Sequence, residues 1–150
     1  MLLKEFIKEL TPWLKQNEKI YRLYEKSNNW NKKNNIYMAN YYSYKLYRKF
    51  NCIISPKAQI GKGLTIPHPS GIVIGEEAVL GKNVVIYQNV TIGRKNRDIP
   101  EYPIIGNNVV IYANSTIVGD VKIGNDAVIG CNSVVLRDVK DGEVVCGIVE

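Results

Sequence analysis

From residue 54 onward, large aliphatic side chains recur at every sixth position, with two interruptions. They occupy Ile54, Ile60, Ile66, Ile74, Leu80, Ile86, Ile92, Ile105, Ile111, Ile117, Ile123, Ile129 and Val135. A half-buried strand has a period of two and an amphipathic helix a period of about 3.6, so a sustained period of six indicates a structural repeat. The pattern predicts short strands that bend after each hexapeptide, with three hexapeptides in one triangular coil.

Small residues accompany each bend of this repeat. Glycine directly follows the aliphatic residue at Gly106, Gly124 and Gly130, and a small or short branched residue stands four places after it. These latter positions are Val109, Ser115, Val121, Ala127 and Ser133. We expect one large side chain per hexapeptide to fill the interior and the small residues to form the tight corners.

The register is interrupted twice, and the interruptions indicate where the functional loops lie. Two extra residues separate Ile66 from Ile74, and seven extra residues separate Ile92 from Ile105. Insertions into a repeat map to loops on one face of the array, which is often the binding face. The first insertion contains His68, the only histidine of the chain.

The first fifty residues have helical rather than hexapeptide periodicity. Apolar residues three and four apart predict helices over residues 1–26 and 35–50. Residues 27–35 (SNNWNKKNN) are rich in turn formers, and we interpret them as a linker that carries an exposed or loosely packed Trp30. The expected domains are a helical segment, 1–52, and a β-helix, 53–150, with the helices capping one end of the coil.

Positive charge is concentrated in this helical segment. The net charge is +6, but residues 1–50 hold 11 Lys and Arg against 4 Asp and Glu, which leaves 9 against 10 for the remainder. On the second helix, Tyr37, Tyr41 and Tyr44 alternate with Lys45 and Arg48 on one side. Such a face can bind nucleic acid, lie on an anionic membrane or pack against protein. We favour packing, keep peripheral membrane contact as an alternative and expect no nucleic-acid partner.

Cysteine usage and hydropathy indicate an intracellular protein. The three cysteines are odd in number and lack metal-ligand spacing, and a single histidine cannot form a zinc site, so we expect reduced thiols and no metal. No apolar run approaches the roughly 20 residues of a membrane span, and the start MLLKEF is too charged and brief for a signal peptide. The expected location is the cytoplasm, including the inner face of the membrane.

Three segments carry a specific resemblance to a known family. PHPSGIVIG (67–75), NVVIYQNVTIG (83–93) and the run 104–135 resemble the hexapeptide-repeat acyltransferases. Within these, the chain is most similar to the serine acetyltransferase-like branch, which includes bacterial capsule and exopolysaccharide O-acetyltransferases. The resemblance implies a mainly β fold, a left-handed parallel β-helix, and a homotrimer with active sites between subunits. It also implies acetyl-CoA as co-substrate.

The resemblance assigns roles to particular residues. His68, with Gly71, matches the turn whose histidine takes the proton from the acceptor hydroxyl, and a free imidazole titrating near pH 6.5 suits this role. Gly93 and Arg94 match the thioester-binding step, where a backbone N–H would stabilise an oxyanion. Ala113 and Cys131 match positions along the pantetheine arm, and we interpret Cys131 as a small packing residue rather than a reactive thiol.

The second insertion, 94–104, resembles the loop that folds over coenzyme A and acceptor. Its Arg94, Lys95 and Arg97 either face coenzyme phosphates or are solvated, and the sequence leaves both readings open.

Several departures from the family pattern concern the acceptor. Pro67 and Ile53 stand where serine acetyltransferases have aspartates, and Glu101-Tyr102 replaces the Arg-His pair that holds the serine carboxylate. Pro67, Glu76, Glu101 and Tyr102 are therefore our candidates for the acceptor side, and either a backbone carbonyl or Glu76 is expected to orient His68.

These departures lead us to expect an acetyl-CoA-dependent O-acetyltransferase that acts on a sugar or polysaccharide precursor. The alternatives are a serine O-acetyltransferase of cysteine biosynthesis and a non-catalytic β-helix scaffold that binds membrane or nucleic acid.

Overall fold

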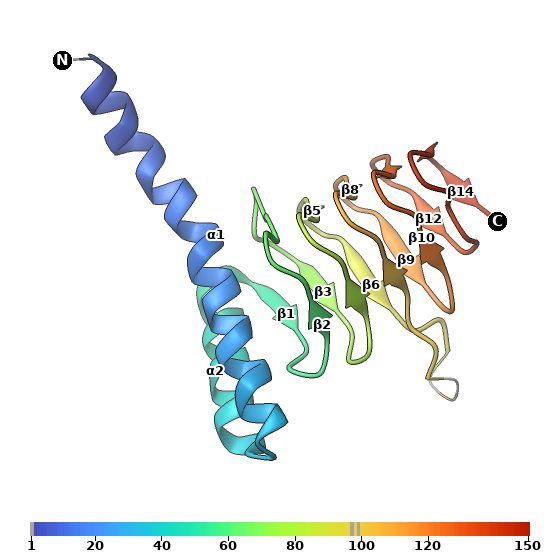
Figure 1. Cartoon of the computed structure of the whole chain (residues 1–150), viewed down its shortest axis with the longest axis horizontal. Coiled ribbons are helices and arrows are strands. Elements are labelled where there is room, and N and C mark those ends of the chain that lie inside the picture. Colours follow the sequence, from blue (N-terminus) through green and yellow to red (C-terminus); the bar gives the residue numbers. More distant parts are fainter. Residues whose placement is uncertain (1, 97, 99) are drawn as a thin grey trace.

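The computed structural model describes the backbone of residues 2–96, 98 and 100–150, and the side chains of these residues from position 16 onward. Two helices stand at one end of a stack of flat triangular coils, and the C-terminus lies at the other end (Figure 1). None of the described helices is both long and apolar enough to cross a membrane.

Fourteen short strands form three parallel sheets, one on each face of the coil. The first sheet contains β1 (Cys52–Ile54), β3 (Ile72–Ile74), β6 (Thr91–Gly93), β9 (Thr116–Val118), β12 (Val134–Val135) and β14 (Ile148–Val149). The second contains β2 (Gln59–Ile60), β4 (Val79–Leu80), β7 (Ile104–Ile105) and β10 (Lys122–Ile123). The third contains β5 (Val85–Ile86), β8 (Val110–Ile111), β11 (Val128–Ile129) and β13 (Val144–Val145).

The predicted six-residue register is confirmed by the strand pairing. Ile74 lies beside Ile92, Ile92 beside Ile117, and Ile117 beside Val135, each one coil further along. All thirteen predicted inward positions are buried except Ile60, which is half-buried and packs against the same core. The small residues four places after them are buried as well. Burial of one aliphatic side chain per face makes a single continuous core along the axis.

Gly106, Gly124 and Gly130 do not adopt the left-handed conformation of the tight turns, so the role that we expected for these three glycines is wrong. In the described part of the coil, positive φ is found at five asparagines, for example Asn83 and Asn108 at φ 57°, at Asp126 and at five other glycines. Gly106 is needed because the neighbouring coil is close: a Cβ built on it would lie 2.8 Å from the backbone nitrogen of Asn125. Asparagine tolerates the left-handed region of φ and ψ. Its side chain also forms a hydrogen bond to the next coil, which glycine, without a side chain, cannot form.

Helix α1 (Leu2–Lys32) extends through most of the segment that we interpreted as a linker, and α2 (Ile36–Phe50) follows after three residues. The linker prediction is therefore wrong for residues 27–32. The turn formers there have structural partners: Ser27 Oγ donates to Ala39 O at 2.8 Å, and Asn28 Nδ2 donates to Pro56 O at 2.8 Å. Trp30 is half-buried, with Lys33 Nζ 5.2 Å from its ring centroid.

The two helices cover the exposed edge of the first coil, as predicted. Ile60 N donates to Tyr24 Oη at 3.0 Å, and Ile66 N donates to Asn17 Oδ1 at 2.8 Å. These backbone groups face the end of the stack, where no preceding strand can pair with them. Side chains of α1 thus satisfy an edge that would otherwise present open hydrogen-bonding groups.

Candidate active site

The predicted site residues fall on two different corners of the triangular coil. We call residues 66–71, 87–90, 112–115 and 130–133 the histidine corner, which precedes the strands of the first sheet. We call residues 75–78, 93–103 and 118–121 the loop corner, which follows those strands. The two corners are joined by the strands between them, such as β3.

His68 lies at the histidine corner, in the two-residue insertion, and its side chain is exposed. Its ring is 6.0 Å from the Tyr87 ring, centroid to centroid, and Tyr87 stacks on Tyr112 at 5.0 Å with an interplanar angle of 19°. The turn is fixed by Gly71, which has φ 65° and donates its N–H to Asn51 O at 2.9 Å. A Cβ at Gly71 would also collide with the Asn89 side chain, so both the conformation and the space favour glycine here.

Sequence reasoning missed the aromatic neighbours of His68 and an adjacent polar group. Tyr87 and Tyr112 each directly follow an inward isoleucine, so the six-residue register could have placed them one coil apart on this corner. Gln88, the next residue, has a buried Oε1 atom with no hydrogen-bond partner among the described residues. An acceptor of this kind is available to a donor from a water, a bound molecule or a second chain.

Two of the predicted coenzyme-binding residues lie further along the histidine corner. Ala113 is half-buried and Cys131 is exposed, one coil apart, and Ala113 O accepts the N–H of Asn132 at 2.9 Å. Three coil spacings of about 4.8 Å separate the level of His68 from that of Cys131, or roughly 14 Å along the axis. Cys131 is not the packing residue that we expected, because its thiol is exposed at the surface of this corner.

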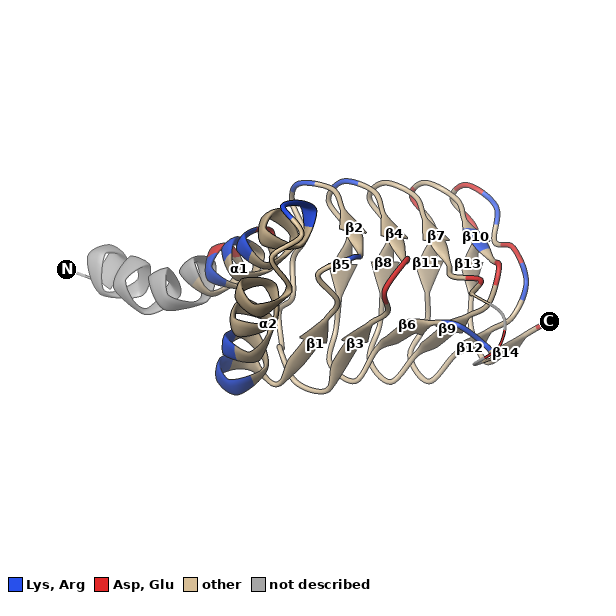
Figure 2. Ribbon diagram, turned by 90° about the horizontal axis from the view of Figure 1, so that it is seen from below, with Lys and Arg blue, Asp and Glu red and all other residues tan. Residues whose placement is uncertain are grey.

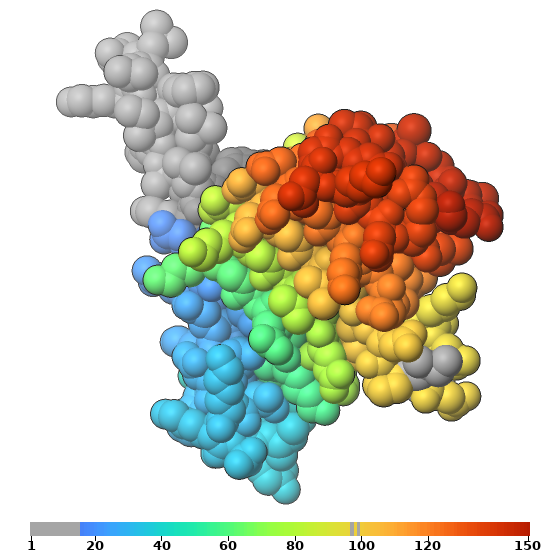
Figure 3. Space-filling view, turned by 45° about the vertical axis from the view of Figure 1, so that its right-hand side comes forward, coloured from blue at the N-terminus to red at the C-terminus, as the bar shows by residue number. Residues whose placement is uncertain are grey.

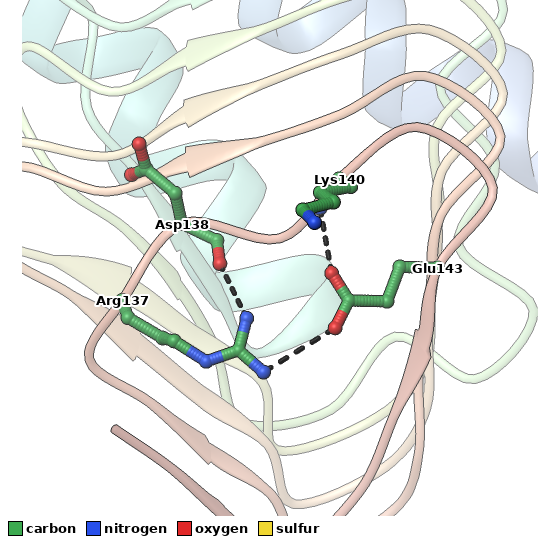
Figure 4. A network of polar contacts seen from close by, with 4 residues as sticks. All are labelled: Arg137, Asp138, Lys140 and Glu143. Carbon is green, nitrogen blue, oxygen red and sulfur yellow. Dashed lines mark hydrogen bonds and ion pairs between the residues drawn. The ribbon is translucent and has the colours of Figure 1, made fainter.

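The other predicted coenzyme-binding residues lie at the loop corner. Gly93 is the last residue of β6, and a Cβ built on it meets no atom within 4 Å, so the space beside it is open. Arg94 and Lys95 are exposed, and Lys95 lies across Gly119. Arg97 lies outside the described residues. The loop that follows Gly93 projects from the side of the stack (yellow in Figure 3).

A hollow of about 550 Å³ lies beneath this loop. Lys95 and Glu101 line it, together with Asp120 and Leu136 from the neighbouring coils. Asp120 and Leu136 were not predicted, because they lie next to the loop only through the stacking of later coils. The hollow combines one cation, two carboxylates and an apolar wall, which suits a polar ligand that also carries apolar groups.

The acceptor-side candidates divide between the two corners. Pro67 precedes His68 at the histidine corner. At the loop corner, Glu76 Oε2 forms an ion pair with Lys57 Nζ at 3.0 Å, and this contact raises the pKa of Lys57. The Tyr102 ring covers the backbone of Gly75, where a Cβ would lie 2.5 Å from its Cε1, while Glu101 is exposed. Glu76 is therefore engaged by Lys57, on the far side of β3 from His68.

One chain does not bring the two halves of the predicted site together. The four residue steps from Gly71 to Gly75, at about 3.3 Å each, put the ends of β3 roughly 13 Å apart. His68, Ala113 and Cys131 lie on one side of this strand, and Gly93, Arg94 and Lys95 on the other. A ligand that contacts both groups must lie between two corners that a single coil keeps apart.

The repeat and the fold agree with the comparisons to known proteins. The family model described as bacterial transferase hexapeptide (six repeats) matches residues 102–137, and the hexapeptide repeat of succinyl-transferase matches residues 58–95. Both models describe hexapeptide repeats, which agrees with the six-residue register of this chain.

Serine acetyltransferases are among the curated relatives of this chain. The serine acetyltransferase of Staphylococcus epidermidis is 46% identical over 93 residues, which cover 61% of this chain and 44% of that protein. The probable serine acetyltransferase 1 of Oryza sativa subsp. japonica is 48% identical over 71 residues, which cover 47% of this chain and 23% of that protein. This chain therefore spans less than half the length of these relatives.

Solved structures give the same picture over more of the chain. A soybean serine acetyltransferase complexed with serine has a TM-score of 0.81 and 34% identity, and the match covers 85% of this chain and 53% of that one. A serine acetyltransferase in complex with CoA has a TM-score of 0.80 and 32% identity, with the same coverage. The left-handed parallel β-helix with N-terminal helices is confirmed. The named relatives are serine acetyltransferases, so the expected polysaccharide branch receives no support.

Proposed function

We propose that this chain is an acetyl-CoA-dependent O-acetyltransferase whose active site forms between subunits of a trimer. The histidine corner of one subunit would face the loop corner of the next. The observation that carries this proposal is the separation of His68 from Gly93 and Arg94 by the width of a face. Similarity to serine acetyltransferases, one of them in complex with CoA, supports the acetyltransferase activity in this proposal.

In this site His68 is the general base. Its imidazole takes the proton of the acceptor hydroxyl as the oxygen attacks the acetyl carbonyl, and a tetrahedral intermediate forms. A backbone N–H at Gly93 or Arg94 stabilises the negative oxygen of that intermediate. The intermediate collapses with cleavage of the carbon–sulfur bond, and the imidazolium returns its proton to the departing thiolate. The products are the acetyl ester and free coenzyme A.

Coenzyme A would lie along the seam. Ala113 and Cys131 leave room for a thin pantetheine arm because their side chains are small, and Arg94 and Lys95 supply cations for its phosphates. The open space at Gly93 fits a thioester beside the backbone. The buried Oε1 of Gln88 would accept a hydrogen bond from a group that enters this seam.

L-serine is the acceptor that the comparisons favour, since the relatives are serine acetyltransferases. A sugar hydroxyl is the second candidate, and a specific observation favours it. Glu101 places a carboxylate where a serine carboxylate would need a cation, and Tyr102 packs on Gly75 instead of offering a charge. A carboxylate can accept hydrogen bonds from sugar hydroxyls, and an aromatic ring beside it can pack against the apolar face of the sugar ring.

The test is the release of coenzyme A thiol from acetyl-CoA, with L-serine and with a panel of saccharides as acceptors. The wild-type chain should turn over L-serine, and His68→Ala should lower the rate by about 10²- to 10⁴-fold, the usual contribution of a general base. Lys82→Ala, an exposed change between β4 and β5 and outside both corners, serves as the control and should keep full activity.

Each outcome of this assay separates the candidates. Turnover of saccharides without L-serine would select the sugar reading. A loss of less than tenfold in His68→Ala would refute the role of His68. No release of coenzyme A with any acceptor would leave the non-catalytic scaffold as the better account.

A further inference from the structure

The outer surface of the two helices carries a basic cleft. It lies between α1 and α2, has a volume of about 790 Å³, and is lined by five cationic and two less polar side chains. The cations are Lys19, Arg22, Lys45, Arg48 and Lys49, and the others are Leu23 and Tyr44. None of these lining residues is acidic. Figure 2 shows basic segments on both helices at the end of the molecule opposite to the C-terminus.

The cleft continues into an exposed tyrosine face on α2. The side chains of Tyr37, Tyr41 and Tyr44 are 86%, 48% and 59% exposed, although tyrosine is usually at least partly covered. Lys45 Nζ lies 4.8 Å from the Tyr41 ring centroid, so an aromatic ring and a cation are held together on this face. Residues 36–50 include no Asp or Glu.

The opposite side of both helices packs inside the molecule. Ala39, Leu46 and Phe50 of α2 are buried, and Tyr24 and Asn28 of α1 bond to the first coil. Packing on the β-helix, which we favoured from sequence, therefore accounts for the apolar side of α2 and leaves the Tyr and Lys side uncovered. Among the described residues, no acidic side chain forms an ion pair with the five cations of the cleft.

We propose that this face docks on an anionic membrane surface. The cations would contact lipid phosphates, and the tyrosines would sit at the headgroup level, where an apolar ring with a polar tip is favoured. Charge argues against a second copy of the same face, because two such surfaces repel each other. The apolar atoms that Leu23 and the Tyr44 ring contribute to the cleft favour glycerol and acyl groups over the sugar–phosphate backbone of a nucleic acid.

Vesicle sedimentation of the full chain tests this inference. Phosphatidylcholine vesicles containing phosphatidylglycerol should bind the protein, vesicles of phosphatidylcholine alone should not, and added salt should weaken the binding. Lys45→Gln/Arg48→Gln should weaken binding by roughly 30-fold, because each basic side chain near an anionic surface contributes a factor of about five. Lys82→Gln/Lys122→Gln removes the same charge from exposed positions on the β-helix. It should change binding less than threefold, well below the roughly 30-fold effect of the first double variant.

Circular dichroism of both double variants verifies that they are folded. An equal effect of the two variants would overturn the proposal, because it would mean that net charge alone governs binding. Full competition by inorganic phosphate would reassign the cleft to a free phosphate ligand. Tighter, salt-sensitive binding to RNA or DNA than to the anionic vesicles would also overturn it. The test does not depend on the acetyltransferase activity.

Discussion

Asparagine side chains link successive coils at two corners of the prism. Asn83 Nδ2 donates to Asn108 Oδ1 at 3.1 Å, and Asn108 Nδ2 donates to Asp126 Oδ1 at 2.9 Å. A second ladder runs through Asn89, Asn114 and Asn132 at the histidine corner. All of these residues have positive φ, so each combines a turn conformation with a bond to the next coil. The period of six predicted where the turns are but not that asparagine makes them.

Asn108→Ala should lower the free energy of unfolding by about 1–2 kcal/mol. Alanine pays a cost of roughly 1 kcal/mol in the left-handed region, and two exposed hydrogen bonds are lost. Asn108→Gly should cost less, because glycine adopts this φ without strain. Urea unfolding measures both, with the exposed helical Asn40→Ala as control. A larger loss for glycine than for alanine would contradict this explanation.

The site residues also differ in how far sequence could predict them. The hexapeptide register places His68, Ala113 and Cys131 on one corner, since they differ by whole coils once the insertions are discounted. It cannot show that Glu76 pairs with Lys57 or that Tyr102 covers Gly75. Those contacts depend on side-chain rotamers and on the path of a loop that has no repeat.

At the scale of elements, the helices are defined by what they contact on the first coil. Residues 27–32 have the composition of a turn, yet they continue α1. Ser27 and Asn28 are buried and bonded to backbone carbonyls, so tertiary partners outweigh their weak helix propensity. Those partners lie 12 to 30 residues away, which local sequence patterns cannot reveal.

Asn28→Ala should destabilise the protein by about 1–3 kcal/mol. Asn28 Nδ2 donates to Pro56 O and to Ala58 O, and removing it leaves Pro56 O without this buried donor. Asn29→Ala changes the exposed neighbour in the same turn and should alter stability by less than about 0.5 kcal/mol. Thermal unfolding followed by circular dichroism compares the two. Equal losses would contradict a specific role for the hydrogen bonds of Asn28 to the first coil, because helix propensity alone favours alanine over asparagine at both positions.

Tyr24 makes the docking of α1 sensitive to high pH. Burial raises the pKa of Tyr24 from 10.0 to about 12, and its hydroxyl donates to Ala58 O at 2.7 Å. The pKa of this phenol is higher in the folded chain than its ordinary value of 10.0. Its contribution to stability is therefore complete below pH 10.0 and is lost as the pH rises toward about 12.

The free energy of unfolding should therefore fall between about pH 8 and about pH 11, and Tyr24→Phe should reduce that fall. Tyr37→Phe, at an exposed position, is the control and should follow the wild type. Urea titrations at the two pH values give the comparison. An identical fall in Tyr24→Phe and wild type would contradict a role for this phenol.

At the scale of the whole molecule, one period accounts for most of the fold. An aliphatic side chain on each face of each coil fixes the core, the three sheets and the direction of stacking. The same regularity keeps His68 and Gly93 on different corners, since a strand of fixed length lies between them. Sequence predicts each corner separately, but a site made from two corners depends on how chains assemble.

Mixing two inactive variants tests directly whether two chains share one site. His68→Ala disables the histidine corner, and Gly93→Val fills the open space at the loop corner without meeting a described atom within 4 Å at Cβ. Each variant alone should lack most of its activity. After the two are unfolded together and refolded, random assortment in a trimer should give about a quarter of the seams two intact corners, and about a quarter of the wild-type rate should return. Activity that stays at the sum of the two separate variants, or full activity of Gly93→Val alone, would contradict a site shared between chains.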